Sequence, residues 1–479
     1  MWVLGLSVVT VLVIYVFHLI YKLKNPKFSS TSSLPPGSMG LPFIGETIQF
    51  MIPSYSLDQH TFFKKRIQRF GPIFRTSLFG QPIVISVDPE FNSYLVQQEG
   101  KLVKLFLGPL SKVFVPDGDH HVYTSDYIHK YFRNVTLSHV GSECIREKLL
   151  PQLEEMSKEA LHMWSTQASI EVYEYSSDML FHIFAKHYFG YDAEKLPKTG
   201  RIAEQLFTTL SKVFMTIPLN IPGTTYHKCL EEAKKAFTIM KNIMEKRKSS
   251  PESYRGDLLD QVMNDMKTEK ILTDDQNVYL VLGVWFATCL AIASLLTLIF
   301  KFLSEYPSVI EELRVEHEEI IKGRDKSSSS LTWGEYKSMK FTQQVINEAL
   351  RFTILIPGLL RTTIKDIQVK EYTIPAGWTI LLATQTLHMN SKIYKDPLTF
   401  NPQRWKDLDS YAISKNFKPF GGGLRQCPGA ELTRATMATF LHVLVTQYRW
   451  TKIRGGNVVR NPMLGFGDGI HIKLWKKNT

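Results

Sequence analysis

The sequence predicts a mainly α-helical protein with a smaller β portion. One N-terminal segment is expected to cross a membrane and anchor the protein there. Three observations support this fold class. Residues 2–21 are uncharged and almost wholly apolar, apolar residues recur at helical spacing through most of residues 90–355, and short β-like runs lie on both sides of that region. The 479 residues are 44% hydrophobic and contain no linker-like break after about residue 40, which indicates one large unit.

The N-terminal run WVLGLSVVTVLVIYVFHLIY is followed at once by Lys22, Lys24 and Lys27, and no positive residue precedes it. About 20 helical residues at about 1.5 Å each span the hydrocarbon core of a bilayer. A positive flank stays in the cytosol, so the body should lie on that side. The basic start and cleavage site of a signal peptide are missing. We therefore expect a membrane anchor over residues 1–24, a Ser/Pro-rich linker over 25–40 and a globular body over 41–479.

The β portion is expected in two places. PIFRTSLFGQPIVISV, residues 72–87, reads as two strands with a turn at Gly80-Gln81, and IQVKEYTIPAGWTILLAT, residues 367–384, reads as two strands around Pro375-Ala376-Gly377. Long helical patterns cover SECIREKLLPQLEEMSKEALHMW and KCLEEAKKAFTIMKNIMEKRK, and ELTRATMATFLHVLVTQYRW supplies the last long helix.

Residues 278–300, VYLVLGVWFATCLAIASLLTLIF, are also uncharged and long enough to span a membrane. A second span would place the preceding helices and the C-terminal third on opposite sides of the bilayer. An all-round apolar helix is also what the core of a large protein requires. We favour a helix through the middle of the body.

Composition excludes several classes of function. The four cysteines are scattered without a CxxC pair, which indicates a reducing compartment with neither disulfides nor structural zinc. The formal charge of +12 is spread along the chain, so it is either a solvated basic surface or a face that docks an acidic protein or an anionic membrane. No nucleic-acid-binding motif and no GxGxxG fingerprint for a dinucleotide occurs.

The stretch with the clearest chemistry is FGGGLRQCPG, residues 420–429. A thiolate is the reactive form of cysteine and needs positive surroundings. Arg425 lies two residues before Cys427, and the helix expected after Pro428 directs its N-terminal N–H groups toward the sulfur. Glycines such as Gly421 let the backbone approach something flat and bulky. The pattern indicates a thiolate metal ligand beneath a planar group rather than an inert buried cysteine.

This loop resembles that of the cytochrome P450 family of haem-thiolate monooxygenases. The resemblance implies the cytochrome P450 fold for residues 41–479, with haem b as cofactor and Cys427 as the axial ligand of its iron. It further implies that Phe420 and Gly421 pack near the ring and that Arg425 meets a haem propionate.

Two further motifs carry the resemblance. NEALR places Glu348 and Arg351 on one helix face, and FNPQRW supplies Arg404. In this family such residues form a buried triad that braces the cysteine loop, and a buried triad must be fully paired because an orphaned charge is costly.

Less specific similarities suggest further haem contacts. LLRTTIKD resembles the stretch whose arginine contacts the propionates, which implies that role for Arg361. HKYFR resembles the helix whose basic residues do the same, so Lys130 and Arg133 are candidates. That helix departs from the common Trp-x-x-x-Arg pattern, and an ordinary solvated helix face is the alternative.

The central helix departs from the family pattern. Most oxygenating members carry an acid followed by a threonine over the haem, and the alignment of FATCLAIAS puts Leu290 and Ala291 at those positions. Neither side chain can give or accept a proton. Thr288 and Ser294 lie three residues before and after Ala291, so either could face the same side.

Three interpretations follow from this departure. The chain is a monooxygenase that delivers protons through water, Thr288 or a substrate hydroxyl; or it uses haem for non-standard chemistry such as rearrangement, dehydration or cyclisation; or it is a non-catalytic haem- or lipid-binding protein. The intact haem motifs argue against the third interpretation.

The overall pattern is most similar to the plant branch of the family that oxidises sterols, brassinosteroids and triterpenoids, through phrases such as LPPGSMGLPFIGETIQF, IPGTTYHKCL and YTIPAGW. The resemblance implies an endoplasmic reticulum membrane protein with its body in the cytosol. It also implies a lipophilic triterpenoid or steroid-like substrate, O2, and electrons from NADPH through a flavin enzyme, NADPH-cytochrome P450 reductase. The expected pocket lining comprises Trp285, Phe286, Thr288, Cys289, Leu290, Ile292 and residues 356–359.

Overall fold

The computed structural model of the chain describes residues 33–106, 108–115, 120–191, 209–210, 212–213, 216–250, 252, 254–269, 272–324, 330–353, 355–461 and 463–477, together with positions 11, 15, 16 and 19. The expected anchor, residues 1–24, and residues 25–32 of the expected linker lie outside the described residues, apart from those four positions.

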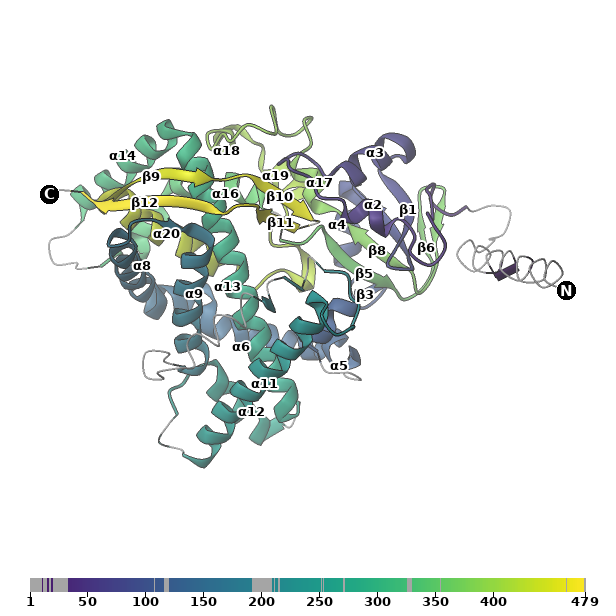
Figure 1. The fold of residues 1–479 in the computed structure, drawn as a ribbon, viewed down its shortest axis with the longest axis horizontal. Coiled ribbons are helices and arrows are strands. Elements are labelled where there is room, and N and C mark those ends of the chain that lie inside the picture. Colours follow the sequence, from purple (N-terminus) through teal and green to yellow (C-terminus); the bar gives the residue numbers. More distant parts are fainter. Residues whose placement is uncertain are drawn as a thin grey trace.

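The larger sheet lies at one end of the body (Figure 1) and holds five strands in the order β1-β2-β8-β5-β3. Strands β2 and β8 are parallel and the other neighbours are antiparallel. These strands are β1 Ile73–Leu78, β2 Gln81–Ser86, β8 Thr379–Leu382, β5 Leu359–Thr363 and β3 Val103–Leu105.

Three smaller sheets complete the described β portion. Strands β4 (Ile170–Glu171), β12 (Ile470–Lys476) and β9 (Tyr448–Gly455) pair in that order, β10 (Val458–Asn461) pairs with β11 (Met463–Phe466), and β6 (Ile367–Val369) pairs with β7 (Tyr372–Ile374).

Helices make up most of the described body, as the sequence predicts. In chain order they are α2 Thr47–Met51, α3 Thr61–Phe70, α4 Pro89–Gln97, η1 Pro109–Val113, α5 His120–Thr124, α6 Asp126–Val140, α7 Ser142–Cys144, η2 Ile145–Leu149, α8 Leu150–Ser165, α9 Val172–Phe189, α11 Thr225–Ser249, α12 Leu258–Glu269, α13 Asp274–Glu305, α14 Pro307–Gly323, α15 Trp333–Ser338, α16 Lys340–Phe352, α17 Thr384–His388, α18 Arg404–Asp407, α19 Ser410–Asn416, η6 Gly423–Arg425 and α20 Ala430–Gln447.

Two expectations about the β portion were wrong. The β1–β2 hairpin turns at Phe79-Gly80, both with positive φ, and Gln81 already pairs with Leu78. Two left-handed residues match the twist of a tight hairpin, whereas a turn one residue later would shift the register. Residues 367–384 form three strands, not two, because Lys370 takes a left-handed conformation (φ 52°) and closes the separate β6–β7 hairpin before Pro375.

Helix α13 runs through the middle of the molecule (Figure 1) and packs on α9, α11, α16 and α20. A capping box between Thr273 and Gln276 fixes its start, and Asp274 and Asp275 place negative charge at its N-terminus. Among the described residues, this is the one helix long and apolar enough to cross a membrane, but 61% of its most apolar window is buried inside the protein. The expectation of a core helix is therefore confirmed.

Candidate active site

The cysteine loop, residues 420–429, contains η6 and leads directly into α20. The Cys427 N–H donates to the carbonyl of Phe420 at 2.9 Å, which closes the loop upon itself. Gly421 and Gly423 both have positive φ. A Cβ on Gly423 would lie 2.2 Å from the Val96 carbonyl oxygen, so glycine is needed where the loop packs against α4.

The Cys427 residue is exposed to a water-sized probe, although the protein around its thiol is dense enough to raise the pKa of that thiol by desolvation. The two observations agree if the residue borders an internal space rather than the outer surface. The Gly429 N–H and the charge of Arg133 act in the opposite direction and lower the pKa, but burial has the larger effect. The cation beside the sulfur is therefore Arg133, and not Arg425 as the sequence suggested.

Arg425 instead belongs to a group of charged residues that we call the Glu99 cluster: Glu99, Asp126, Arg361 and Arg425. Arg361 Nε donates to Glu99 Oε2 at 2.5 Å, and Arg425 Nε lies 3.2 Å from Glu99 Oε1. Arg425 Nη2 also donates to Asp126 Oδ1 at 2.8 Å. Glu99 Oε1 and Arg425 Nε are buried without hydrogen-bond geometry to any described partner. Their contact at 3.2 Å is therefore an ion pair without the geometry of a hydrogen bond.

Helix α6 supplies a further cation beside this cluster. The Arg133 guanidinium donates to the carbonyl of Gln426, one residue before the cysteine, whereas Lys130 is exposed. His129 lies close enough to Arg425 and Arg133 for their charges to act with burial and lower its pKa to about 4. His129 therefore remains neutral at pH 7.

The sequence reasoning missed Glu99, Asp126 and His129. For His129 a signal existed, because it occupies the tryptophan position of the Trp-x-x-x-Arg pattern that ends at Arg133. Glu99 had no such signal, since 262 residues separate it from Arg361.

The second group is the Glu348 cluster, which consists of the charged residues Glu348, Arg351 and Arg404 and the neutral Trp405. The Glu348 carboxylate accepts hydrogen bonds from Arg351 Nη2 at 2.8 Å and Nε at 3.0 Å, and from Arg404 Nε and Trp405 Nε1 at 3.0 Å each. Glu348 and Arg351 are both 0% exposed. The structure therefore brings together the three residues expected to form a triad and adds an indole donor.

His388 connects the Glu348 cluster to the cysteine loop. Arg351 Nη1 donates to the His388 carbonyl at 3.0 Å, and the His388 Nε2 atom accepts from the Lys418 N–H at 3.0 Å, two residues before the loop begins. Burial and the charge of Arg351 lower the His388 pKa to about 3. The neutral imidazole is needed here, because Nε2 must keep its lone pair to accept.

Helix α13 has an accessible stripe in its middle, although most of its other residues are buried. Val284, Thr288 and Ala291 are partly exposed and Ala287 is exposed, at the i, i+3, i+4 and i+7 positions of one face, with Leu290 partly exposed beside them. Ser294 is buried, so Thr288 and not Ser294 shares the face of Ala291.

Four of the residues expected to line the substrate pocket lie in the protein core, and one of them, Trp285, also borders a small pocket between α9, α11 and α13. Trp285, Phe286, Cys289 and Ile292 are buried members of the main core. Trp285 packs edge-on against Phe181 at 4.6 Å between ring centroids. These side chains lie on the faces of α13 that contact neighbouring helices, and Val284 and Ala287 on the accessible stripe are further lining candidates.

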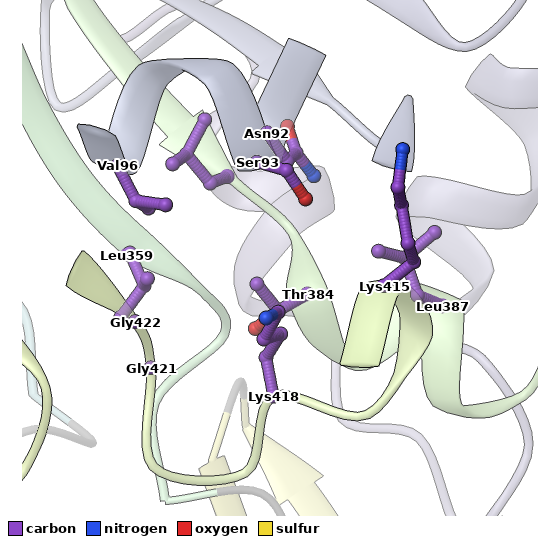
Figure 2. A pocket seen from close by; sticks show the side chains of 11 residues that line it. Asn92, Ser93, Val96, Leu359, Thr384, Leu387, Lys415, Lys418, Gly421 and Gly422 are labelled. Carbon is purple, nitrogen blue, oxygen red and sulfur yellow. The ribbon is translucent and has the colours of Figure 1, made fainter. Parts of the chain in front are cut away.

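One surface hollow lies near the loop but away from its sulfur. Figure 2 shows the pocket between α4, β5 and the first part of the cysteine loop, where Val96, Leu359, Gly421 and Gly422 face one another and Lys418 reaches in. Neither Cys427 nor any residue of α13 lines it. This hollow is therefore not the space that the sulfur borders.

Comparisons with known proteins agree with this geometry. Residues 35–470 match the family model described as cytochrome P450. The chain is 48% identical to cucurbitadienol 11-hydroxylase of Siraitia grosvenorii and 44% identical to the β-amyrin 16-α-hydroxylase CYP87D16 of Maesa lanceolata, in each case over 100% of both chains. It also resembles the retinoic acid-bound cyanobacterial CYP120A1 with a TM-score of 0.80 and 25% identity, over 93% of this chain and 100% of the other.

The fold, the arrangement of the motifs and the full-length similarity to named hydroxylases point to the same enzyme class. The chain belongs to the cytochrome P450 family of haem-thiolate monooxygenases.

Proposed function

We propose that this protein is a membrane-anchored monooxygenase that hydroxylates a triterpenoid or steroid-like substrate, with O2 and electrons that NADPH supplies through NADPH-cytochrome P450 reductase. The observation that carries the proposal is Cys427, an accessible residue whose thiol is closely surrounded by protein. It lies in a chain that matches triterpenoid hydroxylases along its whole length. The domain division into an anchor (1–24), a linker (25–40) and a catalytic body (41–479) is part of the same proposal.

The residues around Cys427 fit a haem. With Arg133 beside it, the Glu99 cluster brings three guanidinium groups against two carboxylates, and the buried Arg425 Nε makes no hydrogen bond, so another anionic group fits here and a haem propionate would supply it. Arg361, Arg425 and Arg133 would hold the propionates, Cys427 would be the axial ligand, and Phe420 and Gly421 would lie against the ring. A bound haem supplies oxygen activation, to which the axial thiolate contributes electron density.

The remaining groups position the substrate and limit where protons come from. The accessible stripe of α13 is mostly apolar and suits a lipophilic molecule. Leu290 and Ala291 neither give nor accept protons; of the three expected sources, water and a hydroxyl of the substrate are favoured over Thr288, whose hydroxyl donates to the Val284 carbonyl.

The location and the electron donor follow from the family and from charge. An apolar N-terminal run followed by lysines suits an anchor in the endoplasmic reticulum membrane with the body in the cytosol. A net charge of +12 suits a reductase with an acidic docking face.

A carbon monoxide difference spectrum tests the ligand. The reduced full-length protein should show the shifted Soret band of a thiolate-ligated haem, and Cys427→Ala should abolish that band. Cys144→Ala, at a partly exposed cysteine outside the loop, is the matched control and should retain it. A band typical of a nitrogen ligand in the unmodified protein would overturn the proposal.

Turnover with reductase, NADPH and either cucurbitadienol or β-amyrin tests the reaction. A product heavier by one oxygen atom supports hydroxylation. Haem incorporation without NADPH use or product from a panel of triterpenoids and sterols would favour a binding protein instead.

The missing acid and threonine support a second candidate, haem chemistry without net oxygen insertion. Under it, products would be isomers or dehydrated forms of the substrate. The double variant Leu290→Glu/Ala291→Thr distinguishes the two, because a large gain in hydroxylation would mean that the natural site is not built for oxygen cleavage.

A further inference from the structure

Thr288 is the one polar residue of the accessible stripe on α13, which consists of Val284, Ala287, Thr288, Leu290 and Ala291. Its hydroxyl has two described partners. Thr288 Oγ1 lies 2.8 Å from the Val284 carbonyl oxygen and 3.2 Å from the hydroxyl of Tyr188 on α9. A polar atom with fixed partners on an otherwise apolar face is a natural point of specificity.

The positions of the protons follow from these partners. Because the Val284 carbonyl can only accept and is the nearer of the two partners, we infer that the single Thr288 proton points to it. The contact with Tyr188 then requires Tyr188 to be the donor. A threonine hydroxyl has two lone pairs, and Tyr188 occupies one of them. Thr288 therefore offers a hydrogen-bond acceptor, and no donor, to a molecule beside the stripe.

Tyr188 is held rigidly in its donor role. It is 0% exposed and stacks on Phe184 with ring centroids 5.6 Å apart. Burial raises the pKa of its phenol well above the usual value. Tyr188 thus stays protonated at neutral pH. Because it is fully buried, it cannot exchange protons readily with solvent, so it acts as a positioning residue for Thr288 and not as a proton source.

We propose that Thr288, oriented by Tyr188, accepts a hydrogen bond from a hydroxyl group of the substrate. The proposal rests on the proposed function, since it names the polar group that the lipophilic substrate must carry. A polycyclic alcohol would satisfy the free lone pair. A ketone or an ester at the same carbon would place one acceptor against another, and it would bind more weakly because a buried polar group stays unpaired.

The test is an equilibrium binding titration of the full-length, haem-loaded protein in detergent, followed by ligand-induced absorbance changes. The probes are cucurbitadienol, its ketone and its O-acetyl ester. The unmodified protein should bind the alcohol about tenfold more tightly than either derivative, the difference that one net hydrogen bond provides. Thr288→Val, which removes the hydroxyl at constant shape, should abolish this preference, and Thr288→Ser should retain it.

Two further variants separate positioning from general damage. Tyr188→Phe should reduce the preference for the alcohol over the ketone and the ester, because Thr288 loses the partner that orients it. The affinity for the ketone should stay unchanged. Thr297→Val is the matched control, because Thr297 lies on the same helix and donates to the Ala293 carbonyl at 2.8 Å but is fully buried. It should keep the full preference. Thermal unfolding and the carbon monoxide spectrum report whether each variant is folded and loaded.

The outcomes distinguish the two proposals. Equal affinity of the unmodified protein for the three probes, or an unchanged preference in Thr288→Val, would overturn the role of Thr288 and leave the proposed function intact. If no triterpenoid or sterol binds to the unmodified protein, the proposed function fails, and the assignment to Thr288 fails with it.

Discussion

The Glu348 and Glu99 clusters have similar composition and opposite character. In each, a buried glutamate pairs with two arginines. The two arginines of each pair are more than 50 positions apart in the sequence. The Glu348 carboxylate is fully paired within the protein, with donors on both oxygens. In the Glu99 cluster, Glu99 Oε1 and Arg425 Nε form an ion pair at 3.2 Å that lacks the geometry of a hydrogen bond, and Arg133 adds a further cation beside the cluster.

The difference distinguishes a structural support from a binding site. Charge that is completely satisfied in the folded chain fixes the position of α16 and of the segment before the cysteine loop. A buried group with more cations than anions and a guanidinium N–H that makes no hydrogen bond costs free energy, and a bound anion can remove that cost. Four experiments test this distinction, from the largest expected effect to the smallest.

Glu348→Gln should lower the free energy of unfolding by about 3–5 kcal/mol, because it leaves two arginines buried without a counter-charge. Chemical denaturation of the folded protein measures this loss. Glu147→Gln is the control, since its ion pair with Arg146 is 53% exposed on both sides and should contribute less than about 1 kcal/mol. Similar losses in both variants would contradict the structural role.

Acid should destabilise the protein partly through His388, whose pKa falls from 6.5 to about 3 on folding. Between these pH values the unfolded chain binds one more proton than the folded chain, so stability falls as the pH is lowered from 6.5 toward 3. One proton corresponds to about 1.4 kcal/mol per pH unit. Denaturation at pH 6, 5 and 4 gives the slope of the unfolding free energy against pH. In His388→Gln this slope should be smaller by about that amount. An unchanged slope would mean that His388 is not neutral in the folded state.

Glu99→Gln should cost about 1–3 kcal/mol in haem-free protein, because Arg361 and Arg425 lose their shared acceptor. The loss should be smaller in haem-loaded protein if propionates replace the carboxylate as acceptors. Thermal unfolding of both forms checks the difference. An equal or larger loss in the loaded form would show that this cluster is structural, as the Glu348 cluster is.

Asp126→Asn should have the smallest effect, below about 1 kcal/mol, because the Asp126 side chain is 46% exposed where it pairs with Arg425. Thermal unfolding at low and high salt measures it. A larger loss of unfolding free energy would mean that Asp126 contributes as much to stability as the buried residues of the Glu99 cluster.

Much of the site could be predicted from short patterns. The spacing in NEALR puts Glu348 and Arg351 on one helix face, and the glycines before Cys427 mark a tight loop, whatever the rest of the chain does. The β portion was less predictable, because Lys370, a residue that does not favour positive φ, forms the β6–β7 turn.

Three features depend on the tertiary structure. The ion-pair partners of Arg425 are Glu99 and Asp126, from distant parts of the chain, and the cation beside the sulfur is Arg133. The accessible face of α13 could not be predicted from the sequence, because residues 278–300 are apolar on every face of the helix. The Tyr188–Thr288 contact joins residues 100 positions apart on two helices.

The sequence by itself determined the helical class, the apolar central helix and the residues of the cysteine loop, because periodicity, turn chemistry and spacing act within a few residues. Only the tertiary structure decided which charges pair, which of these pairs lack a hydrogen bond and which face of α13 stays accessible. Electrostatic and hydrogen-bond partners are chosen by distance in space over a few ångströms, and that distance is set by packing between segments hundreds of residues apart.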